Sequence, residues 1–102
     1  MTDYPWLKTY PQQLNWAQQI PAKPVFDMMD QTVREFPHRP AFDFLGKKYN
    51  WAEMGSLVNR FAAALQKMGV GKGQKIGLFL PNCPYFVICY YGILKTGATV
   101  VN

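Results

Sequence analysis

Few residues of this chain carry groups that could act as a nucleophile, a general base or a metal ligand. Cys83 and Cys89 are the two thiols, and His38 is the one imidazole. The cysteines lie six residues apart on a predicted helix and face different ways, which argues against a disulfide or a shared metal. We expect buried free thiols, as is usual in a reducing compartment. His38 stands between Pro37 and Pro40 with no acidic or cysteine neighbour, so a surface position is favoured over catalysis.

A glycine-rich stretch at residues 69–73 invites comparison with phosphate-binding loops, whose backbone N–H groups cradle anions. It reads Gly69-Val70-Gly71-Lys72-Gly73, which matches neither the Walker pattern nor G-x-G-x-x-G. The order is also wrong, because phosphate loops lead from a strand into a helix and this stretch follows a predicted helix. A flexible turn is the favoured interpretation.

The composition indicates one small globular domain. The 102 residues are 49% hydrophobic and 17% charged, with a net charge of +5, which permits attraction to nucleic acid, anionic lipid or phosphorylated ligands. The bases are spread out, with a loose group at Lys67, Lys72 and Lys75 but no basic helix stripe or zinc motif, so we expect no nucleic-acid partner. No secretory signal opens the sequence, which favours a cytoplasmic location.

Residues 1–23 are predicted to form an extended N-terminal leader. Prolines interrupt this segment and large aromatic residues recur in it: Pro5, Pro11, Pro21, Trp6, Tyr10 and Trp16. Aromatic rings in such segments usually become buried on a surface. Docking on the leader's own chain is the favoured interpretation, and a partner-binding arm is the alternative.

Residues 24–51 are predicted to form a helix and a hairpin. Val25, Met29, Val33 and Phe36 recur at helical spacing, which indicates an amphipathic helix over residues 24–36. Two short strands, residues 41–45 and 47–51, then flank Gly46, as is typical of a hairpin with a tight glycine turn.

A second amphipathic helix is predicted to begin at Asn50. Asn50 and Glu53 have the spacing of a capping box, and Gly69 with Val70 predicts a Schellman stop. Its apolar face is maintained over four turns and consists of Met54, Leu57, Val58, Phe61, Ala62, Leu65 and Met68.

The C-terminal part is typical of a strand–helix–strand unit with parallel strands. Residues 75–80 form an apolar run expected to be a buried strand, and residues 98–101 a second strand. Asn82 or Cys83 can cap the intervening helix, Pro84 suits its first position, and Gly97 its C-terminal stop. A transmembrane helix over residues 76–101 is disfavoured by the prolines within it.

The order and spacing of short motifs resembles the start of the adenylate-forming, AMP-binding acyl-CoA synthetases. The motifs are Pro40-Ala41, Gly46-x-x-Tyr49-Asn50-Trp51-x-x-Met54, Phe61-Ala62-x-x-Leu65, Gly69-Val70-x-x-Gly73, Leu78-x-Leu80-Pro81-Asn82 and Gly92-Ile93-Leu94-x-x-Gly97. The opening Pro5-Trp6-Leu7-Lys8-Thr9-Tyr10-Pro11 and the closing Val100-Val101-Asn102 are most similar to bacterial long-chain fatty-acid–CoA ligases. The resemblance covers essentially the whole chain.

The resemblance implies an α/β fold, with residues 24–102 as the incomplete start of the AMP-binding domain. Asn50, Trp51 and Met54 depart from the family's usual Thr or Ser, Tyr and Leu, but these changes keep the cap and the bulk. The family's phosphate-binding loop, its nucleotide-contacting segments and its C-terminal lysine have no counterpart here. We therefore expect an N-terminal fragment that is scaffold, and assign no catalytic, cofactor-binding or metal-binding role to any residue.

The implied parent enzyme uses ATP, Mg²⁺ and coenzyme A to activate a fatty acid or similar carboxylic acid. Two other classes of function remain open: a small non-catalytic α/β interaction module, and a basic peripheral binder of membrane or nucleic acid. The expected location is the cytoplasm, with peripheral contact to the inner membrane. The isolated chain is expected to self-associate through apolar strands left uncovered.

Overall fold

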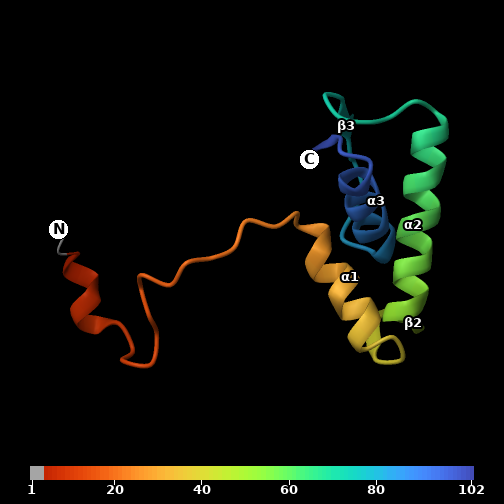
Figure 1. The fold of residues 1–102 in the computed structure, drawn as a ribbon. Coiled ribbons are helices and arrows are strands. Elements are labelled where there is room, and N and C mark those ends of the chain that lie inside the picture. Colours follow the sequence, from red (N-terminus) through yellow and green to blue (C-terminus); the bar gives the residue numbers. More distant parts are fainter. Residues whose placement is uncertain (1–3) are drawn as a thin grey trace.

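The computed structural model describes residues 4–102 and shows three α-helices accompanied by two pairs of strands (Figure 1). In chain order the elements are η1 (Pro5–Thr9), α1 (Phe26–Glu35), β1 (Pro40–Phe44), β2 (Lys47–Asn50), α2 (Trp51–Lys67), β3 (Lys75–Gly77), α3 (Pro84–Lys95) and β4 (Thr99–Val101). The hairpin β1–β2 is antiparallel and the pair β3–β4 is parallel. This arrangement confirms the α/β class, the hairpin and the strand–helix–strand unit.

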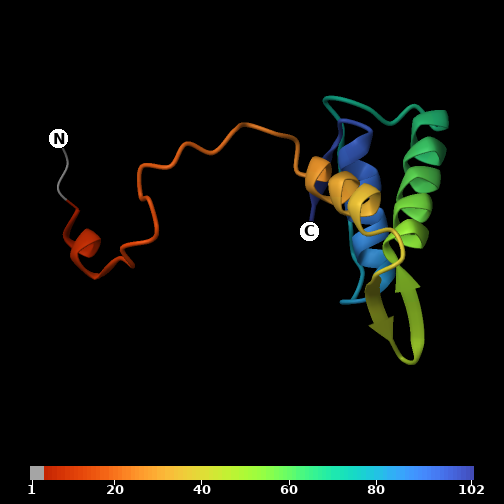
Figure 2. The same cartoon turned by 60° about the horizontal axis from the view of Figure 1, so that its bottom comes forward.

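The N-terminal arm, residues 4–23, extends away from the helices (Figures 1 and 2). Its rings pack on one another: Trp6 stacks on Tyr4 at 4.7 Å between centroids, and Trp16 meets Trp6 and Tyr10 edge-on at 5.7 and 5.4 Å. The expectation that the leader docks on its own chain was therefore wrong. The rings of the arm bury part of their apolar area against one another instead of against the helices. Trp6 and Trp16 nevertheless stay nearly half exposed.

Helix α1 is two residues shorter at its start than the apolar spacing predicted. Met29 is buried and Val33 half-buried, as expected of the inward face. Val25 and Phe36, the two ends of the predicted stripe, lie outside the helix and are 49% and 40% exposed. The guanidinium carbon of Arg39 instead lies 4.6 Å from the centroid of the Phe36 ring, which is a cation–π contact.

The hairpin turns on two residues with positive φ, Leu45 at 50° and Gly46 at 83°. This pairing of angles is the type I′ turn that suits the twist of adjoining strands. The strands are in register from Asp43 opposite Lys48 to Phe44 opposite Lys47, and the pairing is irregular between Pro40 and Phe42. The hairpin projects beyond the helices (Figure 2).

Helix α2 has the two caps that the sequence predicted. The Asn50 side chain accepts a hydrogen bond from the Glu53 N–H at 2.8 Å, and the Glu53 carboxylate accepts one from the Asn50 N–H at 3.0 Å. At the other end Gly69 has φ +87°, and the Val70 N–H donates to the Leu65 carbonyl at 3.0 Å. This is the Schellman bond expected there. Met68, assigned to the apolar face, is instead 78% exposed, because the helix has ended.

The parallel pair β3–β4 is short and open. Strand β3 ends at Gly77 rather than at Leu80, although the Leu78 N–H still donates to the Val101 carbonyl at 2.7 Å. The expected buried strand was wrong in this respect, since only Ile76 of β3 is half-buried and Phe79 is fully exposed. Helix α3 packs against β4, and Ile76 and Val100 pack on the cluster of Leu65, Ile93 and Ala98.

Helix α3 begins at Pro84 as predicted, with Cys83 at the capping position. The Cys83 side chain makes no capping hydrogen bond, so the first turn depends on the fixed φ of proline rather than on a cap. Gly97, with φ +89°, ends the helix at the predicted place.

Two hydrophobic clusters form the core between the helices. The first contains Met29, Tyr49, Met54, Val58 and Ile88, and the second contains Leu65, Ile93 and Ala98. Phe61 packs against both clusters and so joins them. The helices, the hairpin and the parallel pair are thus fixed relative to one another by continuous apolar packing. Within residues 4–102 no helix is long and apolar enough to cross a membrane.

Candidate functional site

The residues singled out for chemistry do not come together. Cys83 lies at the capping position of α3 and Cys89 in the middle of the helix. Both are free thiols, as expected, but they are half-buried rather than buried. Burial raises the pKa of the Cys89 thiol, and the nearby Cys83 charge raises it further. A raised thiol pKa lowers the thiolate fraction and with it the reactivity. His38 is exposed in the loop before β1, as expected.

The glycine-rich stretch is a turn. Gly69 and Gly73 have φ of +87° and +91°, and the Gly71 N–H donates to the side-chain oxygen of Gln74 at 2.9 Å. An amide that is already bonded within its own loop offers no free donor to a phosphate. Gly97 approaches the backbone of Lys72, where an added Cβ would lie 3.5 Å from the Lys72 nitrogen. The stretch therefore joins α2 to β3 and packs against the end of α3.

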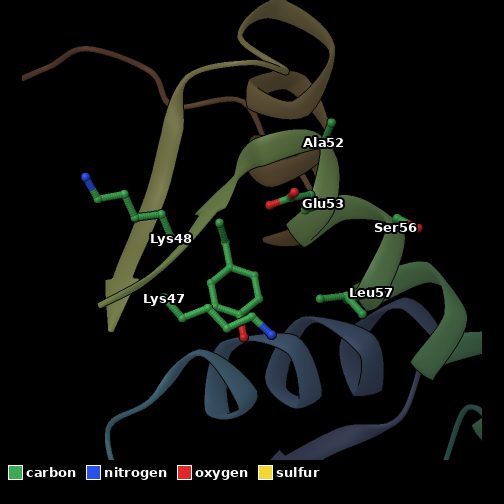
Figure 3. A pocket seen from close by; sticks show the side chains of 7 residues that line it. Lys47, Lys48, Ala52, Glu53, Ser56 and Leu57 are labelled. Atoms are coloured by element: carbon green, nitrogen blue, oxygen red, sulfur yellow. The ribbon is translucent and has the colours of Figure 1, made fainter. Parts of the chain in front are cut away.

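A hollow lies between the hairpin and the first turns of α2 (Figure 3). It has a volume of about 510 Å³ and its lining consists of Lys47, Lys48, Tyr49, Ala52, Glu53, Ser56 and Leu57. We call it the hairpin cleft. Strand β2 supplies the lysines and α2 supplies Ala52, Glu53, Ser56 and Leu57, which follow one another at helical spacing on its near face.

Two charged side chains of the hairpin cleft are already engaged with the protein itself. The ammonium of Lys47 lies 5.0 Å from the centroid of the Tyr49 ring, a cation–π contact. The Glu53 carboxylate is committed to the helix cap through Asn50. The cleft thus contains no nucleophile hydrogen-bonded to a base. Its arrangement is able to bind a group.

A metal centre is not assembled by this part of the chain. Among residues 4–102, no three histidine, cysteine, aspartate or glutamate side chains gather closely enough to hold an ion. The donors that Mg²⁺ prefers are carboxylate and water oxygens in an octahedron, and Asp30, the one carboxylate in an ion pair here, is bound to Lys95.

The fold defines the class of protein. The N-terminal subdomain of NpsA from Klebsiella oxytoca superposes with a TM-score of 0.73 and 28% sequence identity, covering 78% of this chain and 21% of that one. A helix, a hairpin, a second helix and a strand–helix–strand unit, in this order, are the start of the N-terminal subdomain of an adenylate-forming enzyme.

The sequence comparisons place the chain in a family. A profile described as AMP-binding enzyme matches residues 29–102, and the chain belongs to this family. A long-chain-fatty-acid–CoA ligase of Bacillus subtilis (strain 168) is 36% identical over 98 residues, which is 96% of this chain and 18% of the ligase. A crotonobetaine/carnitine–CoA ligase of Escherichia fergusonii is 39% identical over 54 residues, 53% of this chain and 10% of that ligase. The chain spans less than a fifth of either relative.

The hairpin cleft was not found from the sequence. Lys47, Lys48 and Ser56 belong to no motif, and Tyr49 was noticed only as part of the family resemblance. Alternation along β2 could have placed Lys47 and Tyr49 on one face of the hairpin. The cleft depends in addition on the direction in which α2 leaves the strand, and no local pattern specifies that direction.

Proposed function

We propose that this chain is the N-terminal part of a fatty-acid–CoA ligase. Residues 24–102 would be the start of its AMP-binding domain and residues 1–23 its leader. The observation that carries the proposal is the 36% identity with a long-chain-fatty-acid–CoA ligase over 96% of the chain. The match includes the arm as well as the helices, whereas the match to the crotonobetaine/carnitine–CoA ligase covers 53% of the chain.

The proposed reaction has two steps. The carboxylate of the acid attacks the α-phosphate of ATP, forming an acyl-adenylate and releasing pyrophosphate with Mg²⁺ as its counterion. The coenzyme A thiolate then attacks the acyl carbon, forming the thioester and releasing AMP. Residues 4–102 contribute scaffold to this chemistry: the two hydrophobic clusters fix α2 and α3 beneath the sheet that β3 and β4 begin. We propose a cytoplasmic location with peripheral contact to the inner membrane.

The test is an assay of the product of the complete reading frame that contains these residues. We expect palmitate-dependent pyrophosphate exchange and formation of palmitoyl-CoA, and no exchange by the 102-residue chain alone. Preference for crotonobetaine or carnitine over palmitate would overturn the assignment of a fatty acid as the substrate, but not the assignment of CoA-ligase activity. A complete product that activates no carboxylic acid would overturn both.

A non-catalytic interaction module is the second candidate. The observation in its favour is that the described residues close a core: Met54, Val58 and Ile93 are at most 1% exposed, and no buried side-chain polar atom among residues 4–102 lacks a hydrogen bond. A reading frame that ends at residue 102 and encodes a monomer with a cooperative melt would favour this candidate.

A further inference from the structure

The tip of the hairpin exposes a large apolar side chain on a strained backbone. Leu45 is 90% exposed and has φ 50°. Asn, Asp and Gly are preferred at the first position of a type I′ turn, because other residues meet steric strain at positive φ. Leucine at this position is therefore favoured neither by the backbone conformation nor by contact with water.

Phe44 and two lysines adjoin Leu45. Phe44 is 37% exposed, and Lys47 and Lys48 are the first residues of β2 after the turn. Asp43, opposite Lys48, is the one acidic residue of this tip. We define residues 43–48 as the hairpin tip. Its formal charge of +1 comes from two lysines and one aspartate and has the sign of the whole chain, whose net charge is +5.

The shape of the hairpin tip is convex. Its turn projects beyond the helices (Figure 2), while Lys47 and Lys48 also line the hairpin cleft against α2. A protein that accepted Leu45 would need a matching pocket, whereas a bilayer accepts a projecting apolar group anywhere on its surface. Apolar residues flanked by lysines fit the interface of an anionic membrane, where the side chain enters the acyl boundary and the ammonium groups meet lipid phosphates.

We propose that the hairpin tip is a membrane-contact surface that inserts Leu45, with Phe44 beside it, into bilayers containing anionic lipid. Lys47 and Lys48 then lie at the level of the headgroups. Because the apolar contact is small, the binding is weak and reversible. The inference rests on the peripheral membrane contact proposed above and assigns it to named residues, but it does not depend on the ligase activity, since it requires neither ATP, coenzyme A nor a fatty acid.

Flotation of the 102-residue chain with vesicles tests the proposal. The chain should float with vesicles of phosphatidylcholine and phosphatidylglycerol and float less with phosphatidylcholine alone, and high salt should reduce the difference. Flotation separates bound protein from aggregates, which sink. A chain that does not float with either vesicle would overturn the proposal.

Two hairpin variants separate the apolar and the ionic contributions. Leu45→Asn should lower the partition coefficient by about tenfold while keeping or raising thermal stability, because Asn tolerates positive φ better than Leu. The double variant Lys47→Gln/Lys48→Gln should lower binding to anionic vesicles by about fivefold for each lysine and leave binding to neutral vesicles unchanged. Undiminished flotation of Leu45→Asn would contradict the insertion.

Matched controls test other exposed groups. Phe79→Asn removes a fully exposed ring away from the hairpin, and Lys67→Gln/Lys72→Gln removes one charge at the end of α2 and one in the turn that follows it. Both should float as the unmodified chain does.

Loss of flotation in Trp6→Ala/Trp16→Ala, with the hairpin variants unaffected, would assign membrane contact to the arm instead. In the product of the complete reading frame, equal flotation with and without Leu45 would mean that another segment covers the tip, and would overturn the proposal for that protein.

Discussion

The ammonium of Lys95 lies 2.5 Å from a carboxylate oxygen of Asp30. It also donates to the side-chain oxygen of Asn59 at 2.7 Å. A single side chain at the end of α3 is therefore bound to both α1 and α2. The Lys95 and Asp30 side chains are 15% and 32% exposed, so water and salt screen this pair less than a pair on the open surface.

Replacement of Lys95 by methionine is expected to destabilise the chain by about 1–2 kcal/mol, because the half-buried Asp30 carboxylate loses its partner. Urea unfolding would measure the change. Asp30→Asn and the double variant complete a thermodynamic cycle, and the double variant should lose less than the sum of the two single changes. Equal stability of Lys95→Met and the unmodified chain would mean that the pair contributes nothing.

Asn50 caps α2 in the structure, and removal of its side chain should lower the free energy of unfolding. Asn50→Ala is expected to cost about 1 kcal/mol, while Asn50→Ser and Asn50→Thr, which keep an accepting oxygen, should be nearly neutral. Thermal and denaturant melts of the three variants provide the comparison. Equal losses for Ala and Ser would indicate that the Asn50 side chain has a role other than the cap.

Gly92 allows α3 to approach α2 closely. A Cβ on Gly92 would lie 2.5 Å from Cδ1 of Phe61, the residue that joins the two hydrophobic clusters. Gly92→Ala is therefore expected to destabilise by about 1–3 kcal/mol, despite the higher helix propensity of alanine. Phe61→Leu should relieve part of the loss in the double variant. Gly77→Ala is the control, since nothing lies within 4 Å of a Cβ there.

The two thiols should differ in reactivity. Burial raises the pKa of Cys89, so its thiolate forms at higher pH than in the unfolded chain, and alkylation should be slower in the native state. Cys83, at the start of α3, is expected to be labelled first. In Cys83→Ser the alkylation of Cys89 should shift to somewhat lower pH, because the repelling charge is gone. Faster labelling of Cys89 than of Cys83 would contradict this.

The open parallel pair predicts that the 102-residue chain associates with itself. Phe79 is fully exposed, and Leu80 and Val101 are 41% and 46% exposed beside unpaired strand edges. Exposed apolar groups and free edges favour association. Light scattering should show oligomers that diminish in Phe79→Lys and in the product of the complete reading frame. A stable monomer at high concentration would show that the pair needs no cover.

Local signals predicted local structure well. The capping box at Asn50, the stop at Gly69 and the tight turn at Gly46 each depend on a few neighbouring residues, and each was found, although the turn also includes Leu45. The errors concern burial. The apolar run at residues 75–80 indicates a buried strand, but burial depends on what other segments cover it, and Phe79 is uncovered in this chain.

The arm and the hairpin tip show a second limit of sequence reasoning. Trp6 and Trp16 predicted that the leader would pack on the rest of the chain, but their rings pack on each other. Residue spacing alone does not distinguish these two outcomes. Leu45 was predicted to end a strand, whereas it occupies the turn itself. The positive φ of Leu45 follows from the register of the two strands, which is a tertiary property.

The hairpin meets α2 without a linker. Strand β2 ends at Asn50 and α2 begins at Trp51, and the Trp51 N–H donates to the Arg39 carbonyl at 3.2 Å, which also ties the helix to the start of the hairpin. Because no residue between them can act as a hinge, the hairpin and α2 should move as one rigid unit. A tilt of the tip would be transmitted along the 17 residues of α2, about 25 Å at the helical rise, to the turn that leads into β3.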